Sequence, residues 1–402
     1  MASRDDRSTA PAAEIRGLSA RTAHLRQASV LRTLTERVDA LPDGINLGQG
    51  VCDLDIPDVL RSATIRAIES SRATYTPYQG LPSLRRQIVE RMERRYGLRY
   101  AEDEIVVTVG ASGALSSTFL TLLEPGDEVI LFEPFYPYHR SAALLAGARV
   151  VAVPSSGPEW KPDWEALARA LSARTKLVVV NTPANPSGRV WRREDLSRLG
   201  TLLDGTDVRV VSDEIYEDLV YDGRVHVPPA AVPELYDRTI TVSGLGKAYS
   251  ITGWRLGWLA APQPLAAAIG PVFDTLCVCA PRPLQEGAAA ALEALPESYY
   301  GKQRDGYARR RDRLAEALRA GGFTPSVPAG AYYMLADYRE RWGEIPTSQA
   351  SFRLLDELHL AAIPGEIFHA DASPTLLRFH FAVDEPVLDE VTRRLRSARG
   401  GR

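Results

Sequence analysis

The strongest constraint on the fold is a series of short runs rich in Val and Ile, separated by longer segments of helical character. These runs do not alternate with polar residues, which is typical of strands buried on both faces of a parallel sheet. The predicted strands lie at 104–110, 127–134, 148–154, 175–183, 208–214 and 239–244. Helical segments lie between them, as at 112–126, 163–173 and 193–205. The sequence therefore predicts an α/β fold with a mostly parallel sheet sandwiched by helices.

The pattern changes near residue 290, where the regular alternation of strands and helices ends. A long charged helix is expected over 298–322, followed by a helix at 348–362, a strand at 375–382 and a last helix. We therefore predict a smaller α+β domain. The expected division is a disordered tail over 1–13, a large domain over 47–290, and a small domain made of 14–46 and 291–402.

Composition excludes several classes of function. Charged residues are 25% of the chain and its net charge is −3, so neither nucleic acid nor an anionic membrane is expected as a partner. No apolar run approaches the roughly 18–20 residues that cross a bilayer. The Arg run at 308–314 is expected to be a solvated helix face. Cys52, Cys277 and Cys279 are too few for a disulfide framework and lack zinc-site spacing, which predicts a reducing, cytoplasmic setting and no metal.

Chemically distinctive residues follow the predicted strands, where ligands bind in open parallel sheets. The turn after the first strand opens a helix whose N–H groups could hold a phosphate. Later strand ends carry an amide, a carboxylate with a phenol, and a lysine. These residues are Ala111, Ser112, Asn185, Asp213, Tyr216 and Lys247. Nucleotide motifs are excluded, because no G-x-G-x-x-G occurs and Lys247 lies between Thr241 and Ala248 rather than the Gly and Ser/Thr of a phosphate loop.

A family resemblance emerges from four segments, "NTPANPSG", "SDEIY", "SGLGKAYSITGWRLGW" and "LLRFHFA". Their order and spacing resemble the fold-type I pyridoxal-phosphate aminotransferases of class I and II, over about residues 30–398. The segments "INLGQG", "YTPYQGLPSLR", "VGASGAL", "EPFYPYH" and "GAYYMLADY" look closest to the branch with kynurenine, glutamine–phenylpyruvate and methionine aminotransferases. The resemblance implies pyridoxal 5'-phosphate as cofactor, and an L-amino acid and a 2-oxo acid as substrates.

The resemblance also implies roles around the cofactor ring. Lys247 would form a Schiff base with the cofactor aldehyde, and its freed amine would then move the α-proton. Asp213 would keep the pyridine nitrogen protonated, which makes the ring an electron sink. Tyr216 and Asn185 would hydrogen-bond to the ring oxygen, and Tyr136 aligns with the aromatic residue that stacks on the ring.

Further roles concern the phosphate and the substrate. Arg255 would take the phosphate, with Ala111 and Ser112 adding donors from a helix N-terminus. Tyr75 matches a tyrosine that reaches the phosphate of a neighbouring subunit, which implies a homodimer with shared sites. The substrate α-carboxylate would be bound by the residues Arg378, Asn185 and Gly48.

The chain departs from the family pattern three positions before the lysine, where a hydroxyl residue usually donates to the phosphate. This position is Gly244, and Ser243, one step off register, is expected to bind the cofactor phosphate in its place only if the loop shifts. Losing one charge-assisted hydrogen bond costs about 1.5–3 kcal/mol, so we expect weaker cofactor retention. A gap near the phosphate that accommodates something larger is a further hypothesis.

Three functions are weighed. The leading one is transfer of an amino group from an L-amino acid to a 2-oxo acid. The alternative is a lyase, cyclase or oxidase on the same scaffold, because the motifs do not encode the steps after proton removal. A sensor domain of a transcription regulator is disfavoured, since roughly 30 residues precede the resemblance. Aromatic residues near the expected site favour an apolar or aromatic substrate side chain: Tyr78, Tyr138, Tyr332 and Tyr333.

Overall fold

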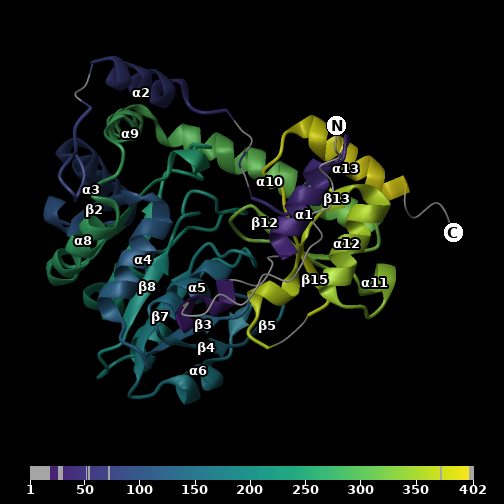
Figure 1. Cartoon of the computed structure of the whole chain (residues 1–402), viewed down its shortest axis with the longest axis horizontal. Coiled ribbons are helices and arrows are strands. Elements are labelled where there is room, and N and C mark those ends of the chain that lie inside the picture. Colours follow the sequence, from purple (N-terminus) through teal and green to yellow (C-terminus); the bar gives the residue numbers. More distant parts are fainter. Residues whose placement is uncertain are drawn as a thin grey trace, which may run out of the picture.

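The computed structural model of the chain describes residues 19–25, 30–50, 52, 55–70, 73–371 and 374–397. The tail expected over 1–13 lies outside these residues. Figure 1 shows a large lobe built around a central sheet and a smaller lobe beside it, with helix α10 (Glu297–Ala320) extending from one to the other. Among the described residues, no helix combines the length and the apolar composition needed to cross a membrane.

The central sheet has seven strands, and the six predicted strands are all among them. In spatial order they are β2 (Ile105–Val109), β10 (Leu256–Ala260), β9 (Thr239–Gly244), β8 (Arg209–Asp213), β7 (Thr175–Asn181), β3 (Glu128–Phe132) and β4 (Arg149–Val153). All run parallel except β10, which is antiparallel to both of its neighbours. The prediction of a mostly parallel sheet is confirmed.

Both faces of this sheet are buried, which explains the Val- and Ile-rich strands. On one face Leu131 belongs to a core with Phe119 of α4 (Gly110–Leu122) and Phe273 of α8 (Gln263–Cys277). On the other face Ile130 belongs to a core with α6 (Trp164–Ala170) and α7 (Arg193–Leu202). Neighbouring strand residues thus point into different cores, and a polar residue at either position would leave a polar group buried.

Strand β10 was not predicted, and its direction matters for the site. Its first residue, Leu256, pairs with Val109 at the carboxyl end of β2. Because β10 is antiparallel, the residue before it, Arg255, emerges at the same edge as the carboxyl ends of the parallel strands. One reversed strand therefore adds an arginine to the edge where ligands bind in such sheets.

The small lobe is an antiparallel sheet covered by helices. Its strand order is β11 (Thr324–Ser326), β12 (Tyr333–Asp337), β15 (Leu376–His380) and β14 (Ile363–Pro364). Helix α1 (Val30–Asp39) contacts α12 (Thr347–Leu358), and the short β1 (Ile45–Asn46) pairs in parallel with β13 (Leu360–Ala361). The exact domain division stays a prediction.

The remaining elements complete the two lobes. They are α2 (Asp58–Ser70), α3 (Pro82–Tyr96), α5 (Pro137–Leu145), α9 (Arg282–Ala294), α11 (Arg339–Trp342), α13 (Glu385–Ser397), the hairpin β5 (Ser155–Ser156) and β6 (Lys161–Pro162), and the 3₁₀ turns Ala20–Leu25, Glu102–Glu104, Pro229–Ala231, Pro233–Arg238, Thr252–Trp254 and Gly365–Phe368.

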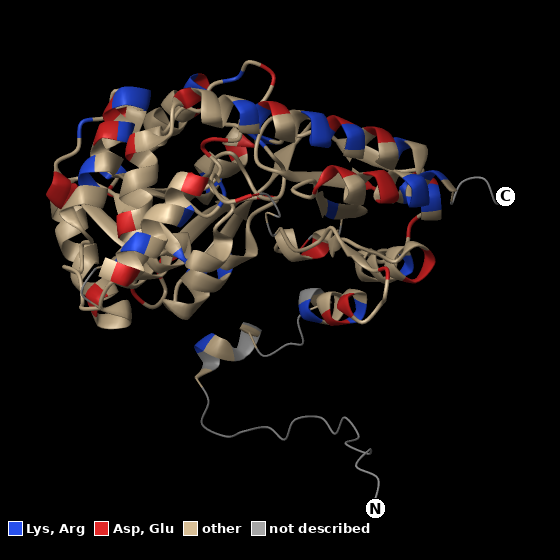
Figure 2. Ribbon diagram, turned by 90° about the horizontal axis from the view of Figure 1, so that it is seen from above, with Lys and Arg blue, Asp and Glu red and all other residues tan. Residues whose placement is uncertain are grey.

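The Arg run on α10 is only in part the expected solvated face, since Arg309 is exposed. Arg311 is buried and donates to the Asp222 carboxylate at 2.7 Å. Arg313 pairs with Glu385 and Asp389 of α13. Basic and acidic residues are interspersed over the outer helices in Figure 2. Arg311 therefore links α10 to Asp222, because a buried guanidinium must be paired, and Arg313 links α10 to α13.

Candidate active site

Lys247 lies in the loop after β9, among aromatic rings. Its Nζ donates to the Gly50 carbonyl at 3.5 Å and lies 5.7 Å from the ring centre of Tyr216 and 5.5 Å from that of Tyr332. Within the described part of the chain, no carboxylate forms an ion pair with this amine. The lysine is therefore half-buried without a fixed anionic partner, as a lysine that bonds a ligand requires.

Asp213 ends β8, and its carboxylate has a partner that the sequence did not reveal. Its Oδ2 lies 2.8 Å from Nε2 of His139, and both side chains are almost fully buried. Oδ1 accepts the backbone N–H of Ile215 at 3.2 Å. His139 is on α5, 74 residues before Asp213, so no local spacing could have indicated this pair. The pair fixes the orientation of the carboxylate at the carboxyl edge of the sheet.

Arg378 joins three segments that are remote in sequence. Its guanidinium donates to the Asn185 side-chain oxygen at 2.9 Å and to the Gly48 carbonyl at 2.6 Å. Its Nε is buried without a hydrogen-bond partner among the described residues. A Cβ on Gly48 would lie 2.7 Å from Cδ1 of Ile363, so a larger residue there would have to displace this side chain. The structure thus brings together the three residues predicted to bind the α-carboxylate.

Arg255 meets the N-terminus of α4, as the direction of β10 implies. Its guanidinium donates to Oγ of Ser112 at 2.7 Å. A Cβ on Gly110 would lie 2.4 Å from that guanidinium, and one on Gly257 would lie 2.6 Å from the backbone nitrogen of Ala111. Two glycines therefore let the arginine and the helix N-terminus converge. Their positive charge and N–H donors suit a phosphate.

Ser243 is not brought to this anion-binding corner. Its hydroxyl is buried and donates to the Glu214 carbonyl and to the Glu217 carboxylate, each at 3.3 Å. The expected gap at Gly244 is also wrong, because a Cβ there would lie 2.9 Å from the Leu256 carbonyl oxygen. Gly244 pairs with Gly257 of β10, so this glycine serves the contact between two strands.

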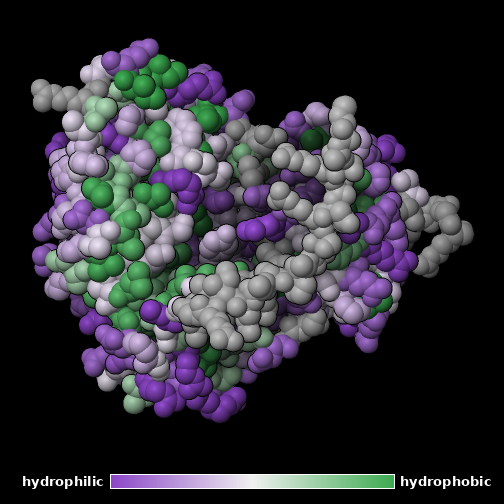
Figure 3. Space-filling view, in the orientation of Figure 1, coloured by the Kyte–Doolittle hydropathy of each residue, from purple (hydrophilic) through white to green (hydrophobic). Residues whose placement is uncertain are grey.

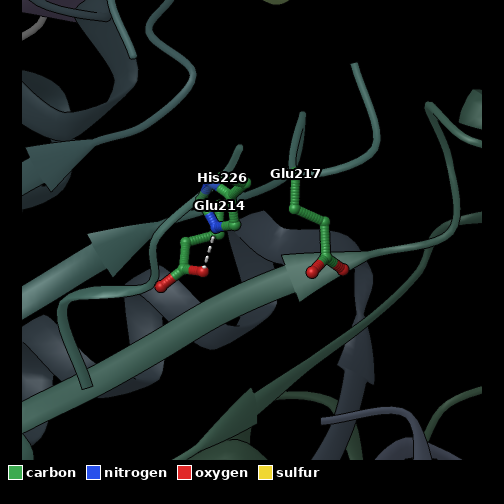
Figure 4. Close-up of side chains that lie close together, drawn as sticks. All are labelled: Glu214, Glu217 and His226. Carbon is green, nitrogen blue, oxygen red and sulfur yellow. Dashed lines mark hydrogen bonds and ion pairs between the residues drawn. The ribbon is translucent and has the colours of Figure 1, made fainter. Parts of the chain in front are cut away.

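The network that holds Ser243 contains Glu214, Glu217 and His226, drawn in Figure 4. Nε2 of His226 lies 2.6 Å from the Glu214 carboxylate, and the Glu217 carboxylate accepts the hydroxyl of Tyr96 at 2.5 Å. The spacing of the three residues could suit a metal ion, but both carboxylates already have partners. Burial raises the pKa of Glu214. Through Glu214 and Glu217, the network connects the loop that bears Asp213 and Tyr216 to His226 and Tyr96.

Tyrosines enclose the space around Lys247. The hydroxyl of Tyr216 donates to that of Tyr333 at 3.3 Å, and burial raises the pKa of Tyr216 well above its usual value. The Tyr136 ring stacks on Tyr138 with centres 5.2 Å apart and meets His139 edge-on at 5.3 Å. Both Tyr332 and Tyr333 are buried in the site.

Two predicted tyrosines lie outside this group. Tyr75 is 78% exposed, and among the described residues no hydrogen bond or ring contact joins it to another site residue. Tyr78 packs beneath α8, where a Cβ on Gly270 would lie 2.6 Å from its ring.

The parallel sheet, the lysine loop and the anion-binding corner define the class of a fold-type I aminotransferase, and comparisons with known proteins agree. The family Aminotransferase class I and II matches residues 42–395, so the chain belongs to this family. It is 36% identical to the methionine aminotransferase of Escherichia coli K12, covering 88% of this chain and 91% of that protein. It is 35% identical to a probable N-succinyldiaminopimelate aminotransferase of Mycobacterium tuberculosis, over 87% and 91% of the two chains.

Solved structures give the same result. The chain superposes with a TM-score of 0.89 on YbdL of Escherichia coli, which was identified as a methionine aminotransferase, at 33% identity over 94% of this chain and 99% of that one. A mutant aspartate aminotransferase of Thermus thermophilus matches with a TM-score of 0.88 and 34% identity, over 96% and 100% of the two chains. The protein is a pyridoxal-phosphate-dependent aminotransferase, and the expected fold, enzyme class, cofactor and amino-group transfer are confirmed.

Proposed function

We propose that the residues gathered around Lys247 hold the cofactor and the amino acid. The chemistry of the donor groups fits pyridoxal phosphate, since Arg255, Ser112 and the N-terminus of α4 offer cationic and N–H groups for its phosphate. At the other end, the buried Asp213 carboxylate supports a protonated ring nitrogen, and Lys247 offers an amine for the aldehyde. The cofactor, when bound, supplies an electron sink for charge that develops at the substrate Cα.

Each residue of the site has its own role in the reaction. Lys247 moves the proton at the substrate Cα, because its amine has no anionic partner among the described residues to hold it. His139 holds the Asp213 carboxylate in place, and Tyr216 and Asn185 donate to the ring oxygen. Tyr136 provides an aromatic face for the ring. Arg378 binds the substrate carboxylate, as its buried and unpartnered Nε supports.

The substrate proposal rests on one observation, namely which groups surround each cation of the site. Arg255 serves the phosphate corner, Arg378 lies between the rings of Tyr333 and Phe368, and Lys247 is surrounded by tyrosines. Among the described residues, no other arginine or lysine contacts Lys247, Arg378 or the rings beside them. The side chains that line the site next to Lys247 are aromatic, as with Tyr332 and Tyr333. We therefore propose an amino donor with an uncharged apolar or aromatic side chain, as in methionine or phenylalanine.

A half-reaction tests both transfer and substrate class. The enzyme with cofactor is mixed with one amino acid at a time, without oxo acid, and its absorbance is followed from the aldehyde form to the amine form of the cofactor. We expect methionine and phenylalanine to react at least about 10-fold more efficiently than aspartate or glutamate, since an unpaired carboxylate would be buried among phenol rings. Adding 2-oxo acids should reverse the change.

Other outcomes have clear meanings. A preference for aspartate or glutamate would contradict the proposed substrate class. Release of ammonia, with the aldehyde form returning unaided, would instead support a lyase on this scaffold. Lys247→Ala is the matched control, because it keeps Arg378 and the aromatic walls but should lose the reaction.

We further propose a homodimer in which Tyr75 reaches the phosphate site of the partner. Several large apolar side chains are exposed on the large lobe: Ile65, Ile68, Tyr75, Leu120, Tyr138, Leu276 and Val278. Figure 3 shows hydrophobic side chains gathered over the face that carries α4 and α8. Exposed apolar side chains that gather on one face are typical of a protein interface.

We also propose a cytoplasmic location and a role in amino-acid biosynthesis. Cys52, Cys277 and Cys279 are free thiols, which suits a reducing compartment. The division into a large domain over 47–290 and a small domain made of 14–46 and 291–402 is likewise proposed, and the contact of α1 with α12 supports it. Fractionation of cells with an antibody against the protein would test the location.

A further inference from the structure

His380, the last residue of β15, is a buried polar group near the site to which the roles above assign nothing. It lies two residues after Arg378, so the two side chains emerge on the same face of the strand. Its Nε2 lies 3.0 Å from the Asn46 carbonyl oxygen, and Nε2 is the donor because a carbonyl only accepts. Nδ1 is buried without a hydrogen-bond partner among the described residues. The imidazole therefore holds the segment just before Gly48.

Asn46 connects His380 to the residues that follow it. The side-chain oxygen of Asn46 accepts the N–H groups of Gly48 and Gln49, each at 3.0 Å. One oxygen that holds two successive N–H groups fixes the turn of the chain after β1. The Leu47 carbonyl also accepts the backbone N–H of His380 at 2.8 Å. Strand β15 thus holds this turn through both the main chain and the side chain of His380.

The peptide unit between Gly48 and Gln49 connects the turn to Arg378. Because a trans peptide is planar, its N–H and its C=O point in opposite directions. The N–H of Gln49 donates to the Asn46 side chain, and the Gly48 carbonyl on the other side accepts Nη2 of Arg378 at 2.6 Å. The orientation of this one peptide therefore decides whether its carbonyl faces the guanidinium. The contacts begin on β15 at His380 and return to β15 at Arg378.

The imidazole of His380 is neutral at physiological pH. Burial lowers its pKa to about 4, although the hydrogen bond to Asn46 opposes this shift. A protonated ring would place a second cation two residues from Arg378, where it would attract the same carboxylate. A neutral ring can therefore hold the turn without competing with the arginine for the substrate.

We propose that His380 is a positioning residue, which sets the guanidinium of Arg378 through the turn at Asn46. The inference rests on the proposed role of Arg378 in binding the substrate carboxylate. Nη1 of Arg378 is held by Asn185 and Nη2 by Gly48, so the buried Nε–H keeps one fixed direction. Ordering a planar fork of donors before the ligand arrives favours binding of a carboxylate.

Binding of 3-phenylpropionate, a carboxylate without an amine, tests the proposal on the holoenzyme without turnover. His380→Leu removes the donor and should weaken this binding about 10-fold, as the loss of one hydrogen bond predicts. His380→Gln keeps an N–H donor and should recover most of the affinity. In the half-reaction with methionine, His380→Leu should raise KM by a similar factor and leave kcat nearly unchanged, because Lys247 is untouched. Unchanged binding in His380→Leu, or no recovery in His380→Gln, would overturn the proposal.

Phe379→Leu is the matched control for a general loss of stability. Phe379 lies between Arg378 and His380, but its side chain emerges on the opposite face of β15. There it packs in the core of the small lobe, with its ring centre 5.9 Å from that of Phe323. This variant should be less stable in urea, yet it should bind 3-phenylpropionate like the wild type. Equal weakening in Phe379→Leu and His380→Leu would show that His380 acts only through stability.

A double-mutant cycle tests the route through the turn. Asn46→Ala should also weaken binding of 3-phenylpropionate, and adding His380→Leu should weaken it little further, because both changes release the same peptide. Additive losses would contradict the proposed route.

Arg378→Ala separates the two proposals. It should lose most of the affinity for 3-phenylpropionate. If it binds this acid like the wild type, the proposed carboxylate site has failed. Crystal structures of His380→Leu and His380→Gln would then decide the positioning role. Loss of the contact between Gly48 and Arg378 in His380→Leu alone would support this role, and its retention in both variants would overturn it.

Discussion

At the scale of single residues, the site depends on partners that hold its functional groups. Asp213 is held by His139 and by the N–H of Ile215, and Arg378 is held by Asn185 and Gly48. Each contact fixes one rotamer of a side chain that would otherwise sample several. The functional groups are thus ordered before any ligand arrives, which lowers the entropic cost of binding.

His139→Asn tests this ordering. The variant should bind the cofactor about 10- to 100-fold more weakly, because a charge-assisted hydrogen bond to Asp213 is worth about 1.5–3 kcal/mol. Cofactor dissociation followed by absorbance measures the effect. Tyr138→Phe is the matched control, since Tyr138 is 59% exposed and its ring, which stacks on Tyr136, is kept. Equal cofactor affinity in both variants would show that His139 does not support Asp213.

At the scale of elements, the glycines around the lysine loop are set by strand contacts. Gly244 of β9 lies opposite Gly257 of β10, and both backbones approach a neighbour too closely for a Cβ. The missing hydroxyl before Lys247 is therefore explained by packing rather than by space for a ligand. The phosphate corner relies instead on Arg255, Ser112 and the N-terminus of α4.

Gly244→Ser should consequently destabilise the protein instead of improving cofactor retention. Overpacking of this kind costs about 1–3 kcal/mol, and the obstructing atoms include the backbone carbonyl of Leu256. Urea unfolding measures the loss. In the control Gly246→Ser, a Cβ would first meet Thr252 at 3.5 Å, an ordinary contact, so a smaller loss is expected. Unchanged stability with tighter cofactor binding in Gly244→Ser would revive the missing-hydroxyl hypothesis.

How much the sequence could predict also differs from element to element. Six strands of the large sheet were predictable, because burial on both faces demands Val- and Ile-rich runs. Strand β10 escaped because "LGWLA" contains a glycine and no β-branched residue. Six candidate site residues followed from their positions at strand ends, whereas their roles, and residues such as Arg255 and Arg378, came from the family resemblance. His139 and the direction of the Ser243 side chain depend on tertiary contacts with residues far away in sequence, which no local pattern carries.

At the scale of the whole molecule, the exposed Tyr75 predicts that one chain does not complete a site. Lys247→Ala and Tyr75→Ala should each reduce activity. Mixed after denaturation and refolding, they should form hybrid dimers with one intact site, restoring about a quarter of wild-type activity if pairing is random. Activity of the mixture measures this. Recovery no greater than the sum of the two variants would contradict shared sites.

A matched mixture makes that test specific. Lys247→Ala mixed with His139→Asn should show no comparable recovery, because His139 and Asp213 act within one chain. Every site in such hybrids carries one of the two defects. Recovery in this control would indicate exchange of something other than Tyr75.

The parallel pairing of β1 with β13 has a consequence for how the enzyme is made. Ile45 pairs with Leu360, and Gly48, just beyond β1, touches Arg378. During synthesis, this early segment cannot make these contacts until Leu360 and Arg378 have been translated. The substrate pocket is therefore among the last parts to form, and a prematurely terminated chain cannot begin to turn over amino acids. Activity therefore requires translation at least as far as Arg378.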